Sequence, residues 1–525
     1  MTQLLGLDLG TTTFKAVVYD ESGGAVASAR ASPPGEATTI DGLRVDFWRA
    51  DALWAVFTQL IRDVVSKLEN PRIDALTIVE IGLVGLPLDK DGHPLHDAVT
   101  WIEPHPSLSA MYERCGVSNE EAFAITGNQL SPIYPPAWIS WLRERVPEYA
   151  SGMKRWVYYG DYLAYRLTGE LAVDLSMASQ TITLDQRTLS YSPRMLGAFG
   201  MDAGMLPSPR PAGTVVGHVR GDAAASTGLQ TGTPVVLGGA DALTGPLGAG
   251  FVAEGDVAIN TGTWECVIVC TDEPRLEPAV AEVGAICDPH VVGGRWTIRI
   301  ENLIGSVTEW FRAEIVAFDS PAVARSEDAW RVLIERAEAA APGAGGVVFY
   351  PYVFGSYGPR LDELARGAFV GLRNTTSQSD LARALFEGLN YHTRHAVESM
   401  LEATGMAPGR VVCMGGGSKN RFWMQNRADV LGRAIEVSED ADVTPRGAAM
   451  LAGVGIGVFE SFEEAAARFV PRCVTIEPDP GLAERYAEIY ADVFRPLGDA
   501  LAPVNHAIAA RTAGRGETEE PDREP

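Results

Sequence analysis

Short apolar runs ending in glycine or threonine alternate along this chain with longer segments of helical periodicity. Leu4–Asp8 and Phe14–Asp20 are predicted strands on either side of a glycine- and threonine-rich turn. Asp51–Leu68 carries apolar residues every three or four positions and is predicted to form an amphipathic helix. Ile78–Leu86 is predicted to be one buried strand. This alternation of strands and helices indicates an α/β fold.

The same pattern continues through the second half of the chain. Pro135–Arg145, Gly160–Leu167 and Arg421–Leu431 are predicted helices, and Val411–Met414 is a predicted strand. A long helix is expected over Ser379–Thr404, with Ser379 as its cap.

The length of 525 residues exceeds what one hydrophobic core usually organises, so two domains are expected. We place an N-terminal domain at residues 1–238 and a C-terminal domain at residues 239–510. The remaining residues, 511–525, are polar and poor in apolar side chains, and are predicted to be disordered.

Two strand–turn–strand units resemble each other although they lie in different halves of the chain. The first has Gly10, Thr11 and Thr12 in its turn, and the second has Gly262 and Thr263. Backbone N–H groups and hydroxyls in such turns donate hydrogen bonds to phosphate oxygens. The pair therefore predicts a duplicated architecture that holds phosphate between its halves.

A single acid, Asp241, follows the apolar strand Val235–Leu237 and the pair Gly238-Gly239. A carboxylate at a strand end, facing a phosphate-binding turn, can accept the hydroxyl proton during phosphoryl transfer to an alcohol. The alternative is that Asp241 caps the next helix and that Gly262 only closes a hairpin. This stretch alone leaves both interpretations open.

Four further positions have chemistry that suits a nucleotide or sugar site. Asp8 ends the first strand, where a carboxylate can hold Mg²⁺, and Lys15 adds positive charge or is a solvated strand residue. Trp101 precedes a proline-broken loop and is either the wall of a sugar pocket or a core residue. The glycines from Gly415 onward separate a strand from a helix and allow a flat or anionic ligand to approach the backbone.

The net charge of the chain indicates which partners to exclude, and its cysteines indicate which cellular compartment to expect. A formal net charge of −25 without a basic cluster argues against nucleic acid and anionic membrane surfaces as partners. The six cysteines form no C-x-x-C pair, which favours a reducing compartment. The N-terminal residues lack a basic leader and a long apolar run, and no later segment is long and apolar enough to span a membrane, so a cytoplasmic location is expected.

Three blocks in this order resemble the FGGY family of carbohydrate kinases: "GLDLGTTTFKAVVYD", "GGADALTGPLGAGFVAEGDVAINTGTW" and "MGGGSKNRFWMQNRADVLG". The resemblance extends from about Leu4 to Phe459. It implies two actin-like, ribonuclease H-like domains with a cleft between them for ATP and a sugar. The expected cofactors are therefore ATP and Mg²⁺.

The resemblance also implies roles for individual residues. Asp241 resembles the catalytic base, and Asp8 the metal-associated acid. The other matched positions are Gly10, Thr11 and Thr12 at the first phosphate turn, Gly262 and Thr263 at the second, and Gly415, Gly416 and Asn420 beside adenosine. Lys15 remains a candidate for nucleotide binding because of its charge, not because of the resemblance. Trp101 and Tyr134 are expected in the sugar pocket, together with Asp241.

Within the family, "NTGTWE" is similar to the hairpin of L-fuculokinases, whereas "GDYLAYRLTGE" and "PYVFGSYGP" fit xylulokinases equally well. Two segments depart from the family pattern. Gly82–Pro87 lacks the Asp or Gln-Met-His residues usually placed against sugar hydroxyls, and Glu103–Pro106 lacks an Arg. A less hydroxylated or deoxygenated sugar would fit such a pocket.

The best substrate prediction is a small ketose or deoxyketose such as L-fuculose, phosphorylated on a terminal hydroxyl. A xylulokinase or another ketose or polyol kinase is the alternative within enzymes. From other classes, an actin- or chaperone-like ATPase and a non-catalytic sugar-sensing relative stay open, as does a homodimer.

Overall fold

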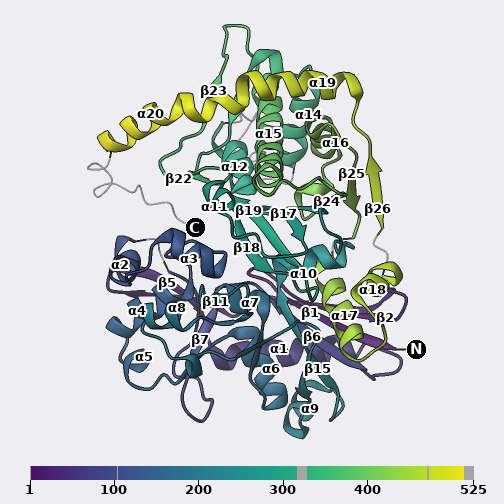
Figure 1. Ribbon diagram of the computed structural model, residues 1–525. Coiled ribbons are helices and arrows are strands. Elements are labelled where there is room, and N and C mark those ends of the chain that lie inside the picture. Colours follow the sequence, from purple (N-terminus) through teal and green to yellow (C-terminus); the bar gives the residue numbers. More distant parts are fainter. Residues whose placement is uncertain (1, 103–104, 316–327, 441, 470–471, 513–525) are drawn as a thin grey trace.

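A computed structural model describes residues 2–102, 105–315, 328–440, 442–469 and 472–512. Figure 1 shows two halves, with the early part of the chain (purple and blue) below and most of the later part (teal to yellow) above. One late helical segment, labelled α17 and α18, lies beside the lower sheet instead. Among the described residues no helix has both the length and the apolar content needed to cross a membrane.

The lower half is built on a six-stranded mixed sheet. Its strands, in spatial order, are β14 (Val215–His218), β15 (Pro234–Ala240), β6 (Ala75–Glu80), β1 (Gln3–Leu9), β2 (Phe14–Asp20) and β3 (Ala25–Ala31).

The upper half is built on a seven-stranded mixed sheet. Its strands, in spatial order, are β18 (Ile286–Pro289), β19 (Trp296–Asn302), β17 (Glu265–Thr271), β16 (Val257–Thr261), β24 (Val411–Met414), β25 (Ile435–Ser438) and β26 (Cys473–Ile476).

The two sheets share one pairing pattern. In the order β3-β2-β1-β6-β15, the first two pairs are antiparallel and the last two are parallel. The order β19-β17-β16-β24-β25 repeats this sequence of pairings. The β1–β2 and β16–β17 hairpins therefore occupy equivalent places, which supports the duplicated architecture expected from their sequences.

A third, five-stranded sheet in the lower half has the order β4 (Gly35–Ile40), β5 (Leu43–Trp48), β8 (Ala98–Ile102), β7 (Gly85–Leu88) and β9 (Arg155–Tyr158). Four two-stranded pairs complete the sheets: β10 (Ala172–Asp174) with β13 (Ser208–Arg210), β11 (Leu184–Asp185) with β12 (Ser190–Tyr191), β20 (Val348–Tyr350) with β23 (Ala368–Val370), and β21 (Ser356–Tyr357) with β22 (Leu361–Asp362).

Helices surround the sheets. The earlier ones are α1 (Ala50–Val65), α2 (Pro106–Arg114), α3 (Asn119–Thr126), α4 (Pro135–Arg145), α5 (Pro147–Ser151), α6 (Tyr159–Thr168), α7 (Leu175–Ser179), α8 (Pro193–Ala198) and α9 (Gly221–Thr227). The later ones are α10 (Asp241–Gly248), α11 (Pro278–Glu282), α12 (Ile304–Trp310), α14 (Asp328–Ala339), α15 (Gln378–Thr404), α16 (Arg421–Leu431), α17 (Val443–Gly455), α18 (Phe462–Arg468), α19 (Pro480–Ile489) and α20 (Arg495–Thr512).

Strand β1 is buried on both faces, which is why it reads as a nearly continuous apolar run. Leu5 and Leu7 belong to the same core cluster as Phe57 of α1. Leu4, on the opposite face, joins the core cluster that contains Ala449 of α17. The central strand of the lower sheet thus lies between an early helix and a late one.

Helix α17 crosses α10 and β1 at very short range, because glycines stand at the contacts. A Cβ atom added to Gly6 would lie 2.0 Å from Pro445 O, and one added to Gly447 would lie 2.1 Å from Thr244 O. Larger residues at either position would push the two elements apart. The small-residue pattern of α17 is therefore a packing requirement at the junction of the halves.

Several sequence predictions need correction. Ile78–Leu86 is not one strand, because β6 ends at Glu80 and β7 starts at Gly85. The cap of α15 is Ser377 rather than Ser379, since Ser377 and Asp380 bond each other's backbone N–H groups.

Two of the domain limits set from the sequence fall inside secondary-structure elements. Strand β15 continues to Ala240, so the predicted boundary at 238 falls inside it. Residues 511 and 512 are the end of α20 and not the start of a tail, while 513–525 lie outside the described residues.

Candidate functional site

An ion pair lies beside the first Gly-Thr turn. Asp8 and Lys15 face each other in the β1–β2 register, and Lys15 Nζ lies 3.4 Å from Asp8 Oδ2. The same Nζ lies 3.5 Å from Asp442 Oδ1, immediately before α17. Burial raises the pKa of Asp8, while the lysine opposes that shift. Lys15 therefore connects the first turn to the late helix that packs on the lower sheet.

Both Gly-Thr turns present their tips to solvent. Thr11 and Thr12 are exposed in the first turn, and Gly10 is half-buried. Gly262 and Thr263 are exposed in the second. Thr11, Thr12 and Thr263 are thus accessible to a ligand, whereas the N–H groups of Gly10 and Gly262 donate to Thr13 O and Trp264 O within the turns.

The second turn is held from one side by the start of α12. Gly262 N–H donates to Trp264 O at 3.0 Å, which closes the turn. The N–H groups of Gly305 and Ser306 donate to Thr263 O at 3.1 and 3.3 Å. A Cβ on Gly305 would lie 2.1 Å from Gly262 O, so this close contact requires glycine.

A fully buried ion pair lies beneath the same turn. Arg427 Nη2 of α16 lies 2.6 Å from Glu265 Oε2, and neither side chain is exposed. The guanidinium also donates to Thr261 Oγ1 at 2.9 Å and to Asn390 Oδ1 at 3.0 Å. Thr393 Oγ1 donates to the other oxygen of Glu265 at 2.5 Å. These contacts fix the two strand ends from which the turn projects.

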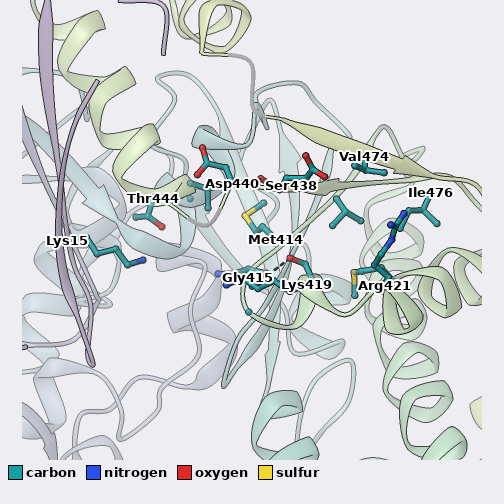
Figure 2. Close-up of a pocket in the computed structure, with 18 residues that line it drawn as sticks. Lys15, Met414, Gly415, Lys419, Arg421, Ser438, Asp440, Thr444, Val474 and Ile476 are labelled. Atoms are coloured by element: carbon teal, nitrogen blue, oxygen red, sulfur yellow. Dashed lines mark hydrogen bonds between the residues drawn. The ribbon is translucent and has the colours of Figure 1, made fainter. Parts of the chain in front are cut away.

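A pocket of about 510 Å³ opens between the first turn and the strand–glycine–helix segment of the upper half. Lys15, Gly415 and Gly416 line it, so the structure brings three predicted site residues together. Figure 2 shows Lys15 on one side and Met414, Gly415 and Lys419 opposite it. An apolar wall beside a glycine turn and two lysines suits a ligand with a flat apolar part and an anionic part.

Asn420 does not line this pocket. Its side-chain oxygen accepts a hydrogen bond from Trp423 N at 3.1 Å and caps α16. Residues that were not predicted line the pocket instead: Ser438 at the end of β25, Glu439 and Asp440 after it, Thr444 in α17, and Val474 and Ile476 in β26. The sequence did contain a signal for these residues. An acidic loop joins β25 to the small-residue helix α17, just as a glycine loop joins β24 to α16.

Asp241 is the first residue of α10, directly after β15. Its Oδ1 accepts a hydrogen bond from Ala242 N at 2.7 Å, and Ala240 N–H donates to Ser176 Oγ at 3.0 Å. Burial raises the pKa of Asp241 to about 7, with a further contribution from the Asp8 carboxylate. The group is therefore suited to act as a base near neutral pH.

A second set of charges lies on the upper side of Asp241 and was not predicted from the sequence. The carboxylate of Glu301 raises the pKa of Asp241, and the guanidinium of Arg299 lowers it. Arg299 is buried between two acids: it contacts Asp288 Oδ2 at 2.9 Å and also pairs with Glu301. These side chains come from β18 and β19, whose polar residues the sequence pattern gave no reason to place at a site.

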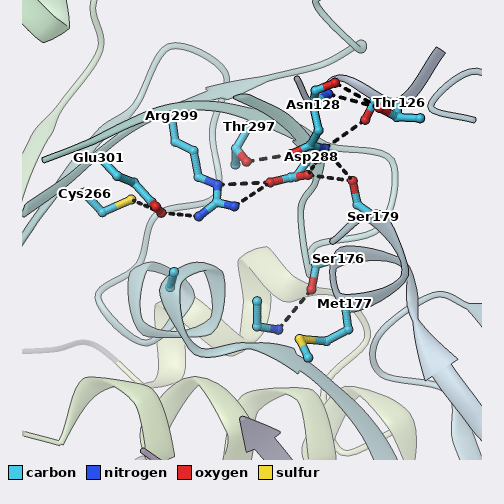
Figure 3. Close-up of polar contacts among 12 residues, drawn as sticks. Thr126, Asn128, Ser176, Met177, Ser179, Cys266, Asp288, Thr297, Arg299 and Glu301 are labelled. Carbon is cyan, nitrogen blue, oxygen red and sulfur yellow. Dashed lines mark hydrogen bonds and ion pairs between the residues drawn. The ribbon is translucent and has the colours of Figure 1, made fainter. Parts of the chain in front are cut away.

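The same acids connect the two halves. Asp288 Oδ1 accepts hydrogen bonds from Ser179 Oγ at 2.6 Å and from Asn128 Nδ2 at 3.2 Å. Figure 3 shows this network running from Asn128 and Ser179 of the lower half through Asp288 to Arg299 and Glu301 of the upper half. Residues from both halves thus fix the charges near Asp241.

Tyr134 belongs to this network rather than to an open pocket. Its side chain is buried, and its hydroxyl donates to Asn128 Oδ1 at 2.7 Å. The Tyr134 hydroxyl is therefore bonded within the protein and does not face an open pocket. Trp101, by contrast, lies on β8 with 41% of its surface exposed.

The segment Gly82–Pro87, which departs from the family pattern, follows a buried acid in the chain. Glu80 ends β6, and its Oε2 accepts a hydrogen bond from Gly160 N at 2.6 Å. Burial raises the pKa of Glu80 well above its ordinary value. A Cβ on Gly82 would lie 1.7 Å from Gln180 Oε1, so no larger residue fits there without displacing Gln180. Residues 103 and 104 of the second departing segment lie outside the described residues.

The paired sheets, the glycine-lined pocket and the acid at the start of α10 define a two-domain nucleotide-dependent phosphotransferase of the actin-like fold. Two family models match the chain: the N-terminal domain of the FGGY family of carbohydrate kinases over residues 3–248, and its C-terminal domain over residues 257–456. The chain belongs to this family and is a carbohydrate kinase.

Individual relatives agree with this assignment. The chain is 28% identical over 468 residues to an L-fuculokinase of Escherichia coli (strain K12). This match covers 89% of this chain and 95% of that protein. It is 26% identical over 514 residues to a xylulose kinase of Bacillus subtilis (strain 168), covering 97% and 99%. A crystal structure of xylulose kinase from Rhodospirillum rubrum is similar with a TM-score of 0.83 and 27% identity, covering 96% of this chain and 100% of that one.

A crystal structure of gluconate kinase from Lactobacillus acidophilus is similar with a TM-score of 0.85 at 23% identity, covering 97% of this chain and 99% of that one. At this identity the likeness concerns the fold. Together with the paired sheets, it establishes the actin-like two-domain architecture predicted from the sequence.

Proposed function

We propose that this kinase transfers the γ-phosphoryl group of ATP to a terminal hydroxyl of a small ketose or deoxyketose, with L-fuculose as the first candidate. The observation that carries the proposal is the position of Asp241. It starts α10, and burial together with the Asp8 and Glu301 carboxylates raises its pKa to about 7. A carboxylate tuned in this way accepts the proton of an attacking alcohol at neutral pH.

The nucleotide half of the proposal rests on the pocket lined by Lys15, Gly415 and Gly416. Adenosine would lie against the glycine segment, and the phosphates would extend toward the two Gly-Thr turns. Backbone N–H groups in the turns and the Lys15 ammonium suit phosphate oxygens.

Asp8 supplies a carboxylate of the kind Mg²⁺ prefers, already beside a phosphate turn, so the donor set fits that ion. When bound there, Mg²⁺ would neutralise negative charge on the phosphates. The protein itself orients the acceptor sugar and excludes water from the site. A carboxylate oxygen of Asp241 takes the proton of the acceptor hydroxyl. Exclusion of water matters because water would otherwise compete as the phosphoryl acceptor.

L-Fuculose is placed first because the L-fuculokinase relative and the "NTGTWE" turn agree, and because the Gly82–Pro87 segment is poor in polar side chains. A deoxygenated sugar leaves fewer hydroxyls unpaired in such a pocket. D-Xylulose is the second candidate, because a xylulose kinase relative matches 97% of the chain at 26% identity.

The test is an ADP-coupled assay on L-fuculose, D-xylulose, L-ribulose, gluconate, glycerol and erythritol. We expect one ketose to be phosphorylated with the highest kcat/KM. Asp241→Asn should lower kcat on that sugar by about 10²–10⁴-fold while ATP affinity is retained. Asp222→Asn, at an exposed acid of α9, serves as the matched control and should leave kcat unchanged. Unchanged kcat in Asp241→Asn contradicts the base assignment, and ATP binding without turnover on any sugar contradicts the proposed function.

A further inference from the structure

The side-chain amide of Gln180 is a polar group without a protein partner in the described part of the chain. Gln180 directly follows α7, and only 7% of it is exposed. Neither Oε1 nor Nε2 hydrogen-bonds any of the residues that the structure describes, and neither atom is completely excluded from solvent. Because buried amides in folded proteins are normally hydrogen-bonded, an unpaired one that solvent still reaches indicates a place for a ligand.

The face of α7 that carries Gln180 is turned toward the residue before Asp241. In α7, Ser176 Oγ accepts a hydrogen bond at 3.0 Å from the backbone N–H of Ala240 (Figure 3). Gln180 still has helical backbone angles, four positions after Ser176. Side chains with this spacing lie on one face of a helix, about 5–6 Å apart. The amide of Gln180 therefore lies one turn beyond the contact that joins α7 to the start of α10.

The end of β6 independently places the same amide near Asp241. Strands β6 and β15 are parallel neighbours, with Glu80 opposite Ala240, so the residues that follow them share one edge of the sheet. Burial, with a smaller contribution from the Asp241 carboxylate, raises the pKa of Glu80. Gly82 comes two residues after β6, and a Cβ atom added to it would lie 1.7 Å from Gln180 Oε1 and 2.7 Å from Nε2. The amide thus occupies the space that a side chain at position 82 would take.

We propose that the Gln180 amide hydrogen-bonds a hydroxyl of the acceptor sugar and thereby helps to determine which sugar the kinase accepts. The amide donates through Nε2 and accepts through Oε1, and a hydroxyl can complement either atom. A sugar that lacks this hydroxyl leaves the amide unpaired and is disfavoured. The nucleotide is an unsuitable partner, because Gln180 does not line the pocket proposed for it. This inference rests on the proposed function.

The first test compares acceptor and nucleotide kinetics in Gln180→Met, which keeps the length of the side chain and removes its donor and acceptor. We expect kcat/KM for the preferred sugar to fall about three- to tenfold, as loss of one neutral hydrogen bond does, while the KM for ATP is unchanged. The acceptors include monodeoxy analogues of that sugar. For the analogue without the bonded hydroxyl, Gln180→Met and the unaltered kinase should have the same kcat/KM. Gln230→Met, at an exposed glutamine after α9, is the matched control.

The second test uses the close approach of Gly82 to the amide. Gly82→Ala places a methyl group against Gln180 and should raise the acceptor KM by displacing the amide. In a Gln180→Ala background the same change should have little further effect, because the shorter side chain leaves that space free. Equal effects of Gly82→Ala in the two backgrounds would contradict the proposed contact.

Binding measurements separate this inference from the proposed function. Titration calorimetry without nucleotide should show weaker binding of the preferred sugar to Gln180→Met, and unchanged binding of the analogue that lacks the bonded hydroxyl. An unchanged affinity for the preferred sugar, an equal loss for every analogue, or a rise in the KM for ATP instead overturns the role of Gln180 while leaving the Asp241 assignment intact. Absence of turnover by the unaltered kinase on every sugar would overturn the proposed function, and the calorimetry would still test Gln180.

Discussion

The ion pair between Arg427 and Glu265 gives the sharpest test of how the second phosphate turn is held. Both side chains are completely buried, and the guanidinium also bonds Thr261 and Asn390. Removal of one partner leaves a buried charge without compensation, which costs about 3–5 kcal/mol. Arg427→Met and Glu265→Leu should therefore each remove a large part of the about 5–15 kcal/mol that usually stabilises a domain.

The double variant Arg427→Met/Glu265→Leu should be far less destabilised than the sum of the two single variants. No charge is then left in the core, and the main residual cost is the hydroxyl of Thr261, about 1–3 kcal/mol. A double-mutant cycle, measured by urea unfolding of the upper half, should show a coupling energy of at least about 2 kcal/mol. Single-variant losses that add to within about 0.5 kcal/mol would refute the reasoning.

A functional consequence accompanies the stability effect. Arg427→Lys keeps the charge but loses the planar fork that bonds Glu265 and Thr261 together. We expect the variant to stay folded while the KM for ATP rises, since the turn above the pair is no longer fixed. An unaltered KM for ATP in a folded Arg427→Lys enzyme would show that the pair serves stability alone.

The remaining predictions concern pH and helix packing. Because the pKa of Asp241 is raised to about 7 and the base must be deprotonated, kcat/KM should fall about tenfold per pH unit below 7 and level off above it. Glu301→Gln removes a neighbouring negative charge and should move the midpoint of this profile to lower pH. A flat profile between about pH 5.5 and 9 would contradict the assignment of Asp241 as the base. Gly447→Ala introduces a Cβ 2.1 Å from Thr244 O and should destabilise the protein by about 1–3 kcal/mol in thermal unfolding, whereas Gly197→Ala in α8, with no heavy atom within 4 Å of the added Cβ, should have little effect.

Local elements were predictable wherever their limits are set by residues next to them. Phe14–Asp20 and Val411–Met414 have the strand bounds expected from apolar runs that stop at polar or glycine residues, and Arg421–Leu431 has the predicted helix bounds. Ser379 was the wrong cap because a capping box needs a second residue three positions later, and Ser377 with Asp380 provides it. Adjacent residues were enough to predict the bounds of these two strands and this helix, but not to identify the cap of α15.

The site divides in the same way. Glycine turns and the acid after β15 carry a local sequence signal, so Lys15, Gly415 and Gly416 were predicted and do line one pocket. Asn420 shares the glycine segment but is occupied as the cap of α16, a role that depends on where the helix starts. The sequence signal identifies the segment near a ligand, but not which of its side chains are free to reach that ligand.

The polar network escaped prediction for a stronger physical reason. Strand β19 alternates apolar and polar residues, the pattern of a sheet with one face in water. In the folded chain Ile298 and Ile300 face the upper core, but Thr297 and Arg299 are also buried, because the lower half covers their face. The sequence pattern of a polar strand face is the same whether that face is in water or covered by another part of the chain, so only the tertiary structure distinguishes the two. The charges that tune Asp241 are therefore encoded in residues whose local pattern predicts only solvent.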